Sequence, residues 1–245
     1  MMYPEPSKAT LRARRHQRGF TLIEMAVVLV IAGLLIGMLA PLLGQVLENN
    51  RTAATTAHLN TIEEALVVFV RANGRIPCPA LPNATPLGTE TGNCNGNNDD
   101  GIVPYRTLGL SEDVARDGYK NFFTYHVAEQ YADTGLNPDI TVGFCTQNQT
   151  LTVQDASSGD LAPGQEVVYV LVSHGENGFG HYSPPGANQV NDNGGTHESE
   201  NTDDDDVYVQ TTPLAAGVTG GPYDDTIRWR TRDQIGNDVQ EFGCS

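Results

Sequence analysis

The sequence predicts an α+β fold in which a long N-terminal helix, first membrane-spanning and then amphipathic, packs on a small, mostly antiparallel β-sheet with long loops. Three patterns favour this fold: an almost uninterrupted apolar run at 20–43, helical spacing of apolar residues further along, and short strand-like runs separated by turn residues. We expect a leader at 1–19, a membrane helix at 20–44, its amphipathic continuation at 45–74 and a globular domain at 75–245.

The apolar run is long enough to cross a membrane. At 1.5 Å per residue, a helix from Phe20 to Leu43 covers the roughly 30 Å of a bilayer core. An ordinary signal peptide has an apolar core of about 7–15 residues and a small-residue cleavage site, and neither fits here. Glu24 is the one charged residue in the run. A carboxylate costs about 2.5–3.5 kcal/mol at the membrane centre, so Glu24 requires a partner or a purpose.

Charge predicts the orientation of this helix and excludes one class of partner. The basic residues of the leader are Lys8, Arg12, Arg14, Arg15 and Arg18, against the single acid Glu5. By the positive-inside rule the N-terminus stays in the cytoplasm and the chain after Leu43 is exported. The whole chain has a formal charge of −16 and the leader contributes +4, so the remainder carries −20. Such an acidic field repels phosphate backbones and disfavours nucleic-acid binding.

The long helix is expected to change character along its length. Pro41 removes one backbone hydrogen bond, so we expect a kink or a loosened turn there. Beyond it, apolar residues at helical spacing predict a stripe that packs on the globular domain. These residues are Leu59, Ile62, Leu66 and Phe69. The helix is expected to end at Asn73-Gly74, where glycine suits a left-handed cap.

The four cysteines are expected to form disulfides, because an exported domain lies in an oxidising compartment. Cys78 and Cys94 bracket most of a long loop at 75–100, and a bridge between them contributes about 3 kcal/mol in the chain-entropy picture. Cys145 and Cys244 then pair, which tethers the C-terminus and contributes about 4.7 kcal/mol. Connectivity cannot be read from sequence, and a Cys78–Cys145 bridge is the competing arrangement.

Short elements fill the rest of the chain. Ser111-Glu112-Asp113 predicts the start of a helical turn. The asparagine-rich tract 93–101 lacks the glycine position of an EF-hand and is interpreted as a turn-rich surface. Six runs rich in β-branched and aromatic residues predict strands. They are Phe122–Val127, Ile140–Phe144, Leu151–Val153, Val167–Ser173, Val207–Gln210 and Ile227–Arg230.

The hexapeptide Gly19-Phe20-Thr21-Leu22-Ile23-Glu24, after a basic leader, resembles the processing site of type IV pilins and of type II secretion pseudopilins. The resemblance implies that prepilin peptidase cuts after Gly19 and methylates the new amine of Phe20. It also implies that Glu24 corresponds to the glutamate that the family uses in assembly, and Pro41 to the proline that interrupts its helix.

Three later segments extend the resemblance to the globular domain. Residues 117–125 are similar to the D-P-W-G-N-P-Y-x-Y signature of major pseudopilins, with Gly118 in place of proline and Tyr119 in place of tryptophan. Residues 173–178 and 225–229 look like the S-x-G-x-D-G and D-I-x-x-W segments of that group. A long insertion around 179–222 departs from the pattern.

The resemblance implies a structural subunit of a type II secretion pseudopilus or a type IV pilus, and no enzyme. The implied partners are prepilin peptidase, other pilin or pseudopilin subunits, the inner-membrane assembly platform and the membrane, without nucleic acid. The implied location is the inner membrane, crossed once, with a cytoplasmic N-terminus and a periplasmic C-terminal domain, and then the filament. The alternative is a monomeric, membrane-anchored binding protein for calcium or a carbohydrate.

Glu24 is expected to drive assembly by pairing with the Phe20 amine of a neighbouring subunit. Both charges lie in a medium of low dielectric constant, where each needs a partner, so their pairing fixes the axial stagger of the subunits. Pairing within one chain and a protonated Glu24 are the alternatives.

Calcium is the one cofactor that the resemblance suggests. Similar pseudopilins bind calcium between the segments matched here by Asn177 and Asp225, and Asp224 adds a hard oxygen ligand. Asn177 replaces an expected aspartate, although the acids at 203–206 could compensate for the lost charge. A solvated acidic loop without a metal ion is the alternative.

Two other chemistries are disfavoured by the sequence. Ser173-His174 near His181 lacks a nucleophile-elbow pattern, which argues against a hydrolase. His174, His181 and His197 lack the close pairing of a zinc site, and only a fold that gathers them around one cavity would revive that idea.

Overall fold

The computed structural model of the 245-residue chain describes residues 20–94, 99–186, 189–190, 194–203, 205–239 and 244, with the side chains of residues 39–43 left out. The chain divides into two compact units, Met1–Leu47 and Glu48–Ser245. The predicted leader, with Gly19 at the expected cleavage point, lies outside the described residues.

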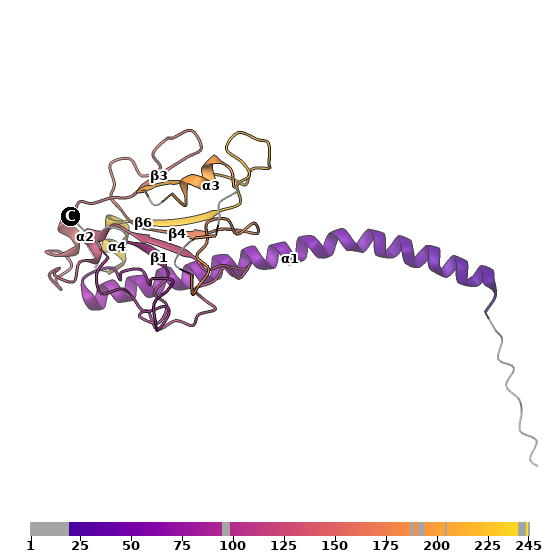
Figure 1. The fold of residues 1–245 in the computed structure, drawn as a ribbon, viewed down its shortest axis with the longest axis horizontal. Coiled ribbons are helices and arrows are strands. Elements are labelled where there is room, and N and C mark those ends of the chain that lie inside the picture. The colour runs from indigo at the N-terminus through magenta and orange to yellow at the C-terminus, as the bar shows by residue number, and fades with distance from the viewer. Residues whose placement is uncertain are drawn as a thin grey trace, which may run out of the picture. The chain divides into compact units, whose positions relative to one another are not determined.

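Helix α1 (Leu22–Asn73) is the longest element (Figure 1). Its assignment continues through Pro41, where the expected interruption would fall. It ends where the sequence predicts: Gly74 has a φ of +67°, and its N–H donates to the carbonyl of Val70 at 2.7 Å. Glycine carries no Cβ penalty in this left-handed cap, which explains the stop.

The second half of α1 presents an apolar stripe to the core of the second unit. Leu59, Ile62 and Leu66 are at most 1% exposed, as their spacing predicts. Val70, and not Phe69, completes the stripe. Phe69 is only partly buried, and the Arg75 guanidinium lies 5.2 Å from its ring centroid. The prediction of Phe69 as a core residue is therefore wrong by one position.

The main sheet is antiparallel and has four strands in the order β1-β2-β4-β6 (Figure 1). These strands are β1 (Asp100–Ile102), β2 (Thr124–Val127), β4 (Val167–Ser173) and β6 (Thr226–Thr231). Every residue of β4 is buried, as its unbroken β-branched and aromatic run requires of a central strand. The predicted α+β class with an antiparallel sheet is confirmed. Strand β1 falls at the end of the predicted loop.

A second, two-stranded sheet pairs β3 (Thr152–Gln154) with β5 (Val207–Val209) in parallel. Strand β5 lies within its predicted run and β3 overlaps Leu151–Val153, extending one residue beyond it, but their parallel pairing was not foreseen. Parallel strands need a long crossover connection, and here that connection contains β4 and the insertion.

The predicted strand Ile140–Phe144 is wrong. This segment forms turns that lead into a short 3₁₀ helix, η1 (Phe144–Thr146). The Asp139 carboxylate accepts hydrogen bonds from the N–H and the hydroxyl of Thr141 at 3.0 and 2.6 Å. Such local side-chain bonds compete with a β ladder, which is why hydrophobicity alone misled the interpretation.

Three short helices complete the fold: α2 (Glu129–Ala132), α3 (Thr196–Glu200) and α4 (Arg232–Val239). None of them was predicted. The segment at Ser111-Glu112-Asp113 does form successive i,i+3 turns, with the N–H of Val114 donating to the Ser111 carbonyl at 3.2 Å. It is not assigned as a helix.

Both expected disulfides are present. Cys78 pairs with Cys94 at a Cα–Cα distance of 5.5 Å, and Cys145 pairs with Cys244 at 5.1 Å. No cysteine is free. The second bridge packs Cys244 beside Gly236 of α4, so it attaches the C-terminal residues to the core.

Candidate functional site

The first turn of α1 is closed by a reciprocal cap. The hydroxyl of Thr21 accepts a hydrogen bond from the N–H of Glu24 at 3.3 Å, and the Glu24 carboxylate accepts one from the N–H of Thr21 at 3.3 Å. This is the capping box that a Thr-x-x-Glu sequence encodes. The carboxylate expected to act in assembly thus also starts the helix.

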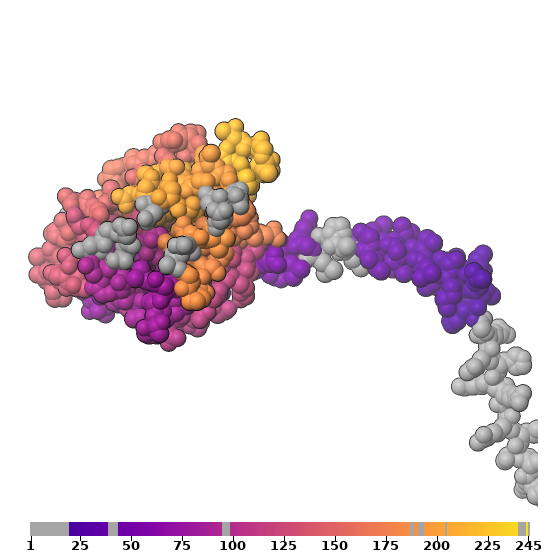
Figure 2. Space-filling view, in the orientation of Figure 1, coloured from indigo at the N-terminus to yellow at the C-terminus, as the bar shows by residue number. Residues whose placement is uncertain are grey.

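The large apolar side chains described in the first unit are exposed to solvent. Phe20 is 75% exposed and Leu22 is 90% exposed, and the large apolar residues that follow up to Met38 are at least 47% exposed. Figure 2 shows this segment in indigo with its side chains on the surface. Within the residues that the structure describes, no helix combines the length and the hydropathy that a membrane span requires.

The three segments that resemble pseudopilins meet in the second unit. The hydroxyl of Ser173 donates to the buried Asp117 carboxylate at 2.8 Å, and Ser173 pairs with Thr226 across β4 and β6. Gly118, which stands where the family has proline, donates its N–H to the hydroxyl of Thr55 at 2.9 Å. A proline has no N–H to donate, so this chain uses the position differently.

At the end of this contact region, three carboxylates converge. One oxygen from each of Glu198, Asp224 and Asp225 lies within 4.8 Å of the others. Glu198 comes from α3, whereas the two aspartates precede β6. Glu198 is 0% exposed and Asp225 is 5% exposed. We call these three residues the acidic cluster.

Each carboxylate of the acidic cluster has one satisfied oxygen and one bare oxygen. Glu198 Oε1 accepts from the N–H of Asp224 at 2.8 Å, and Asp225 Oδ2 accepts from the Asn201 amide at 2.8 Å. Glu198 Oε2, Asp224 Oδ1 and Asp225 Oδ1 are buried without a hydrogen-bond partner. Buried polar atoms normally have partners, so these three oxygens, of which Asp225 Oδ1 lies 3.7 Å from His174 Nδ1, form a group that could hold a cation.

Electrostatics agrees with this geometry. Burial, with a smaller contribution from the charge of Asp225, raises the pKa of Glu198 to about 7. Burial also raises the pKa of Asp224 above its ordinary value, again with a contribution from Asp225. Without a cation, Glu198 and Asp224 therefore hold protons more tightly than free carboxylates do.

Of the residues predicted to bind calcium, Asp224 and Asp225 belong to the acidic cluster and Asn177 lies beside it. The Asn177 amide donates to Glu198 at 2.8 Å, and its oxygen accepts from the N–H of Phe179 at 2.9 Å. Asn177 thus orients Glu198, which supplies the third carboxylate. Among the described acids at 203–206, none joins the acidic cluster.

The residues weighed for catalysis and zinc are arranged for neither role in the described part of the chain. Ser173 is bonded to Asp117, and His174 Nε2 lies 2.8 Å from the hydroxyl of Thr124. The other two histidines, His181 and His197, do not join His174 in a metal-binding group.

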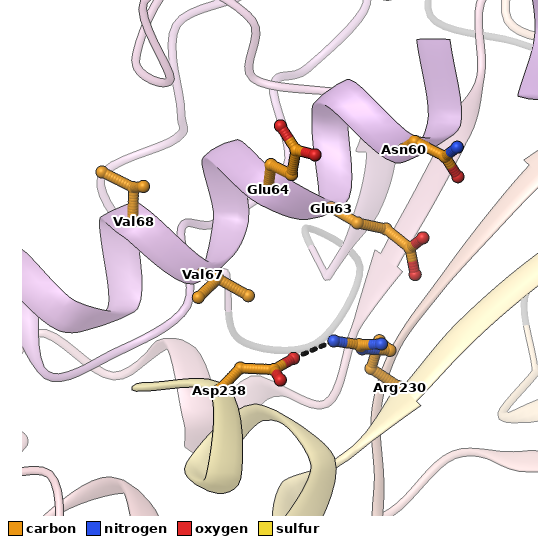
Figure 3. Close-up of a pocket in the computed structure, with 7 residues that line it drawn as sticks. All are labelled: Asn60, Glu63, Glu64, Val67, Val68, Arg230 and Asp238. Atoms are coloured by element: carbon orange, nitrogen blue, oxygen red, sulfur yellow. Dashed lines mark hydrogen bonds and ion pairs between the residues drawn. The ribbon is translucent and has the colours of Figure 1, made fainter. Parts of the chain in front are cut away.

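Two cavities bear on the function of the second unit. A cavity of about 260 Å³ reaches Asp224 of the acidic cluster and is also lined by Glu48, Tyr119 and Glu176. A larger groove of about 540 Å³ lies between α1, β6 and α4 (Figure 3). Its lining residues are Asn60, Glu63, Glu64, Val67, Val68, Arg230 and Asp238, with an ion pair between the last two.

Comparison with known families identifies the N-terminal motif. Residues 14–40 match the prokaryotic N-terminal methylation motif, which is the signature of type IV pilins and pseudopilins. The chain therefore carries a pilin-type N-terminus, which points to a structural, exported, membrane-anchored protein. No match to a curated protein or to a solved structure was found.

Sequence reasoning missed two functional features. Glu198 lies in the insertion, 26 residues before Asp224 in sequence, and no motif marks it. The capping box of Thr21 and Glu24 was visible in the Thr-x-x-Glu spacing but was not used.

Proposed function

We propose that this protein is a prepilin-like structural subunit of a type II secretion pseudopilus or a type IV pilus. The observation that carries the proposal is the methylation motif at residues 14–40, followed by a helix whose apolar side chains are exposed. An apolar surface of this kind needs partners, and identical helices of other subunits supply the matching surface.

Processing is the first step of the proposed function. Prepilin peptidase cuts after Gly19 and methylates the amine of Phe20. Residues 20–44 then cross the inner membrane once, with the N-terminus in the cytoplasm and the domain at 75–245 in the periplasm. The span rests on the sequence: an apolar run of adequate length preceded by basic residues.

Assembly is proposed to use Glu24 twice. Within one chain its carboxylate caps the N–H of Thr21. After cleavage, the Phe20 amine of a neighbouring subunit provides a positive charge for the same carboxylate. A wrong axial stagger leaves both charges unpaired in hydrocarbon, so Glu24 selects the register. Pro41 is proposed to loosen the helix so that subunits can pack.

The decisive experiment compares Glu24→Gln with Glu64→Gln in cells that contain the peptidase. Both variants should be processed to a chain that starts at methylated Phe20, as measured by intact mass. Glu24→Gln should be depleted at least tenfold from sheared filaments, whereas Glu64→Gln, which removes an exposed carboxylate from the same helix, should enter normally.

Two results would contradict the proposal. A membrane form that retains Met1 to Gly19 would refute processing. Normal co-sedimentation of Glu24→Gln would refute the assembly role. Filaments that never form under any condition would instead favour a monomeric, membrane-anchored protein that binds calcium or a carbohydrate.

Cation binding is a second function, favoured by the three bare carboxylate oxygens. We propose that Glu198, Asp224 and Asp225 hold calcium, with Asn177 and Asn201 orienting two of them. Calcium prefers oxygen ligands at 2.3–2.6 Å and tolerates irregular geometry, which suits one carboxylate from α3 and two from the segment before β6. The ion would join the insertion to the strand that begins at Thr226. No catalytic step is proposed.

A further inference from the structure

The groove between α1, β6 and α4 has features that neither filament assembly nor calcium binding uses (Figure 3). Glu63 and Val67 project from α1 toward Arg230 of β6 and Asp238 of α4. The carbonyl of Asp238 accepts a hydrogen bond from Arg71 of α1 at 2.8 Å, which ties α4 to α1 beside the groove. The walls of the groove are therefore held by three elements that contact one another.

Strand β6, which forms one wall, is the outermost strand of the main sheet. It pairs with β4 on one side, and no described strand pairs with its other side. In antiparallel pairing, alternate residues direct their N–H and C=O groups away from the partner strand. About half of the backbone groups of Thr226–Thr231 thus point toward the open edge. The opposite edge strand, β1, differs, because Ile102 exchanges two backbone hydrogen bonds with Ala80 at 2.9 and 3.0 Å.

The open edge of β6 runs alongside α1. Thr226, at the start of β6, lines the same cavity as Thr56 of α1. Arg230, near the end of β6, lines the groove together with Glu63, one and a half to two turns further along α1. The strand and the helix therefore follow each other in the same direction, and a segment that lies along β6 also lies along α1.

The wall formed by α1 carries negative charge. Among the described residues, Glu63 and Glu64 have no ion-pair partner, whereas Arg230 is paired with Asp238. The Glu63 carboxylate accepts a long hydrogen bond from the Tyr169 hydroxyl at 3.5 Å, which leaves its charge uncompensated. A basic side chain is the complementary group for these two carboxylates.

Apolar surface lies next to these acids. Val68 is 61% exposed and Val67 is half-buried. Glu63 and Val67 are four residues apart on α1, which is about 6 Å along the helix axis. Alternate residues of a β-strand are about 6.8 Å apart and point to the same side. A strand added at β6 can therefore place a basic side chain beside Glu63 and its next inward side chain, an apolar one, beside Val67.

We propose that this groove binds an extended segment of another polypeptide, which adds to the open edge of β6 and directs alternate basic and apolar side chains at α1. The backbone of the segment would hydrogen-bond to β6, and its side chains would recognise Glu63, Glu64 and the two valines. A second copy of this chain matches poorly, because the chain has a formal charge of −16. The inference is independent of filament assembly and of calcium binding.

The test is binding of a capped, fluorescently labelled peptide, Thr-Val-Thr-Lys-Thr-Val-Thr, to the full chain in detergent, measured by fluorescence anisotropy. Its inward side chains are Val, Lys and Val in both directions, so it fits either strand orientation. A peptide with Glu in place of Lys should bind at least tenfold more weakly, since Glu63 and Glu64 repel it.

Backbone methylation separates strand addition from simple attraction. Two further peptides carry methyl groups on alternate backbone nitrogens, one set on each edge of the strand. The set that faces β6 should abolish binding, because those nitrogens can no longer donate hydrogen bonds, and the other set should leave binding intact.

Three variants of the protein locate the site. Glu63→Gln removes the charge, keeps an acceptor for Tyr169 and should weaken binding of the lysine peptide at least tenfold. Val67→Thr should weaken it roughly fourfold, the equivalent of one methyl group withdrawn from apolar contact. Glu200→Gln, on α3 and outside the groove, is the matched control and should leave the affinity unchanged.

The inference is overturned if the lysine peptide does not bind, which would mean that the edge of β6 is merely protected by its charged side chains. It is equally overturned if both methylated peptides bind as tightly as the unmodified one. Self-association of the full chain that Val67→Thr abolishes would assign the groove to a second copy and overturn the choice of partner. Fluorescence of Trp229, the single tryptophan, checks that each variant is folded.

Discussion

Replacing Glu198 by Gln should remove most of the pH dependence of stability in the calcium-free protein. Burial raises the pKa of Glu198 from the ordinary 4.5 to about 7, with a further contribution from the charge of Asp225. A raised folded-state pKa means that the folded state binds the proton more tightly than the unfolded state does. The associated stability is complete below about pH 4.5 and is lost as the pH rises through about 7.

The size of the effect follows from this displacement. One pKa unit corresponds to about 1.4 kcal/mol, so a change from 4.5 to about 7 corresponds to at most about 3.5 kcal/mol. For a chain of this size, each kcal/mol shifts the melting temperature by roughly 2–4 °C. About 2.5 kcal/mol of this is lost between pH 5 and pH 8, so we expect the calcium-free wild-type protein to melt roughly 5–10 °C lower at pH 8 than at pH 5.

The assay is thermal unfolding of the full chain in detergent, followed by the fluorescence of Trp229, whose indole N–H donates to Gln210 at 2.8 Å. Glu198→Gln should lose most of this difference and keep the part that the raised pKa of Asp224 contributes. Glu200→Gln, a neighbouring glutamate of α3 that is outside the acidic cluster, is the matched control and should behave as the wild type does.

Calcium should offset the stability that the calcium-free protein loses at high pH. A cation stabilises the ionised carboxylates, and at 100 times its dissociation constant it adds about 2.7 kcal/mol to the free energy of unfolding. The wild-type protein should then melt higher at pH 8 than it does without calcium, and Glu198→Gln should gain less. If Glu198→Gln keeps the full pH dependence, or if calcium and chelator give equal melting temperatures, the account of the acidic cluster is wrong.

Three further predictions concern the framework of the second unit, each measured as a change in the free energy of unfolding. Glu90→Gln should cost about 1.5–3 kcal/mol, because Arg75 donates to both oxygens of Glu90 at 2.9 and 3.0 Å in a mostly buried pair; a loss below 0.5 kcal/mol would contradict this. Gly118→Ala should cost about 1–3 kcal/mol, since the added Cβ would overlap the backbone of α1. An unchanged unfolding midpoint would contradict this prediction and show that the backbone of α1 moves to accommodate the Cβ. Replacing Cys145 and Cys244 together by Ser should cost about 2–5 kcal/mol, because a 99-residue separation is no longer bridged; equal stability of the double variant and the oxidised wild type would refute the tethering role.

Much of the fold could be read from local patterns. The stripe at Leu59, Ile62 and Leu66, the stop at Gly74 and the strand Val167–Ser173 all appear where periodicity and turn chemistry place them. These features depend on residues a few positions apart, so a single sequence carries the whole signal. The failure at Ile140–Phe144 has the same origin, because there the local signal of Asp139 opposed the apolar run.

The candidate sites differ in how much of each the sequence could predict. The processing motif, with Phe20 and Glu24, is contiguous, so the sequence determined it without any knowledge of the fold. Asp224 and Asp225 were also predicted as metal ligands. Only the tertiary structure placed Glu198 of the insertion against them.

The same holds for His126, which meets Asp206 only because β5 lies beside the main sheet. The two residues are 80 positions apart, and no spacing rule connects side chains that separate parts of the chain bring together. The sequence by itself determined the N-terminal methylation motif, the long helix and most of the strands, because those depend on contiguous residues. The tertiary structure decided which buried carboxylates and which histidine share a space, because that depends on long-range packing of the sheets and the insertion.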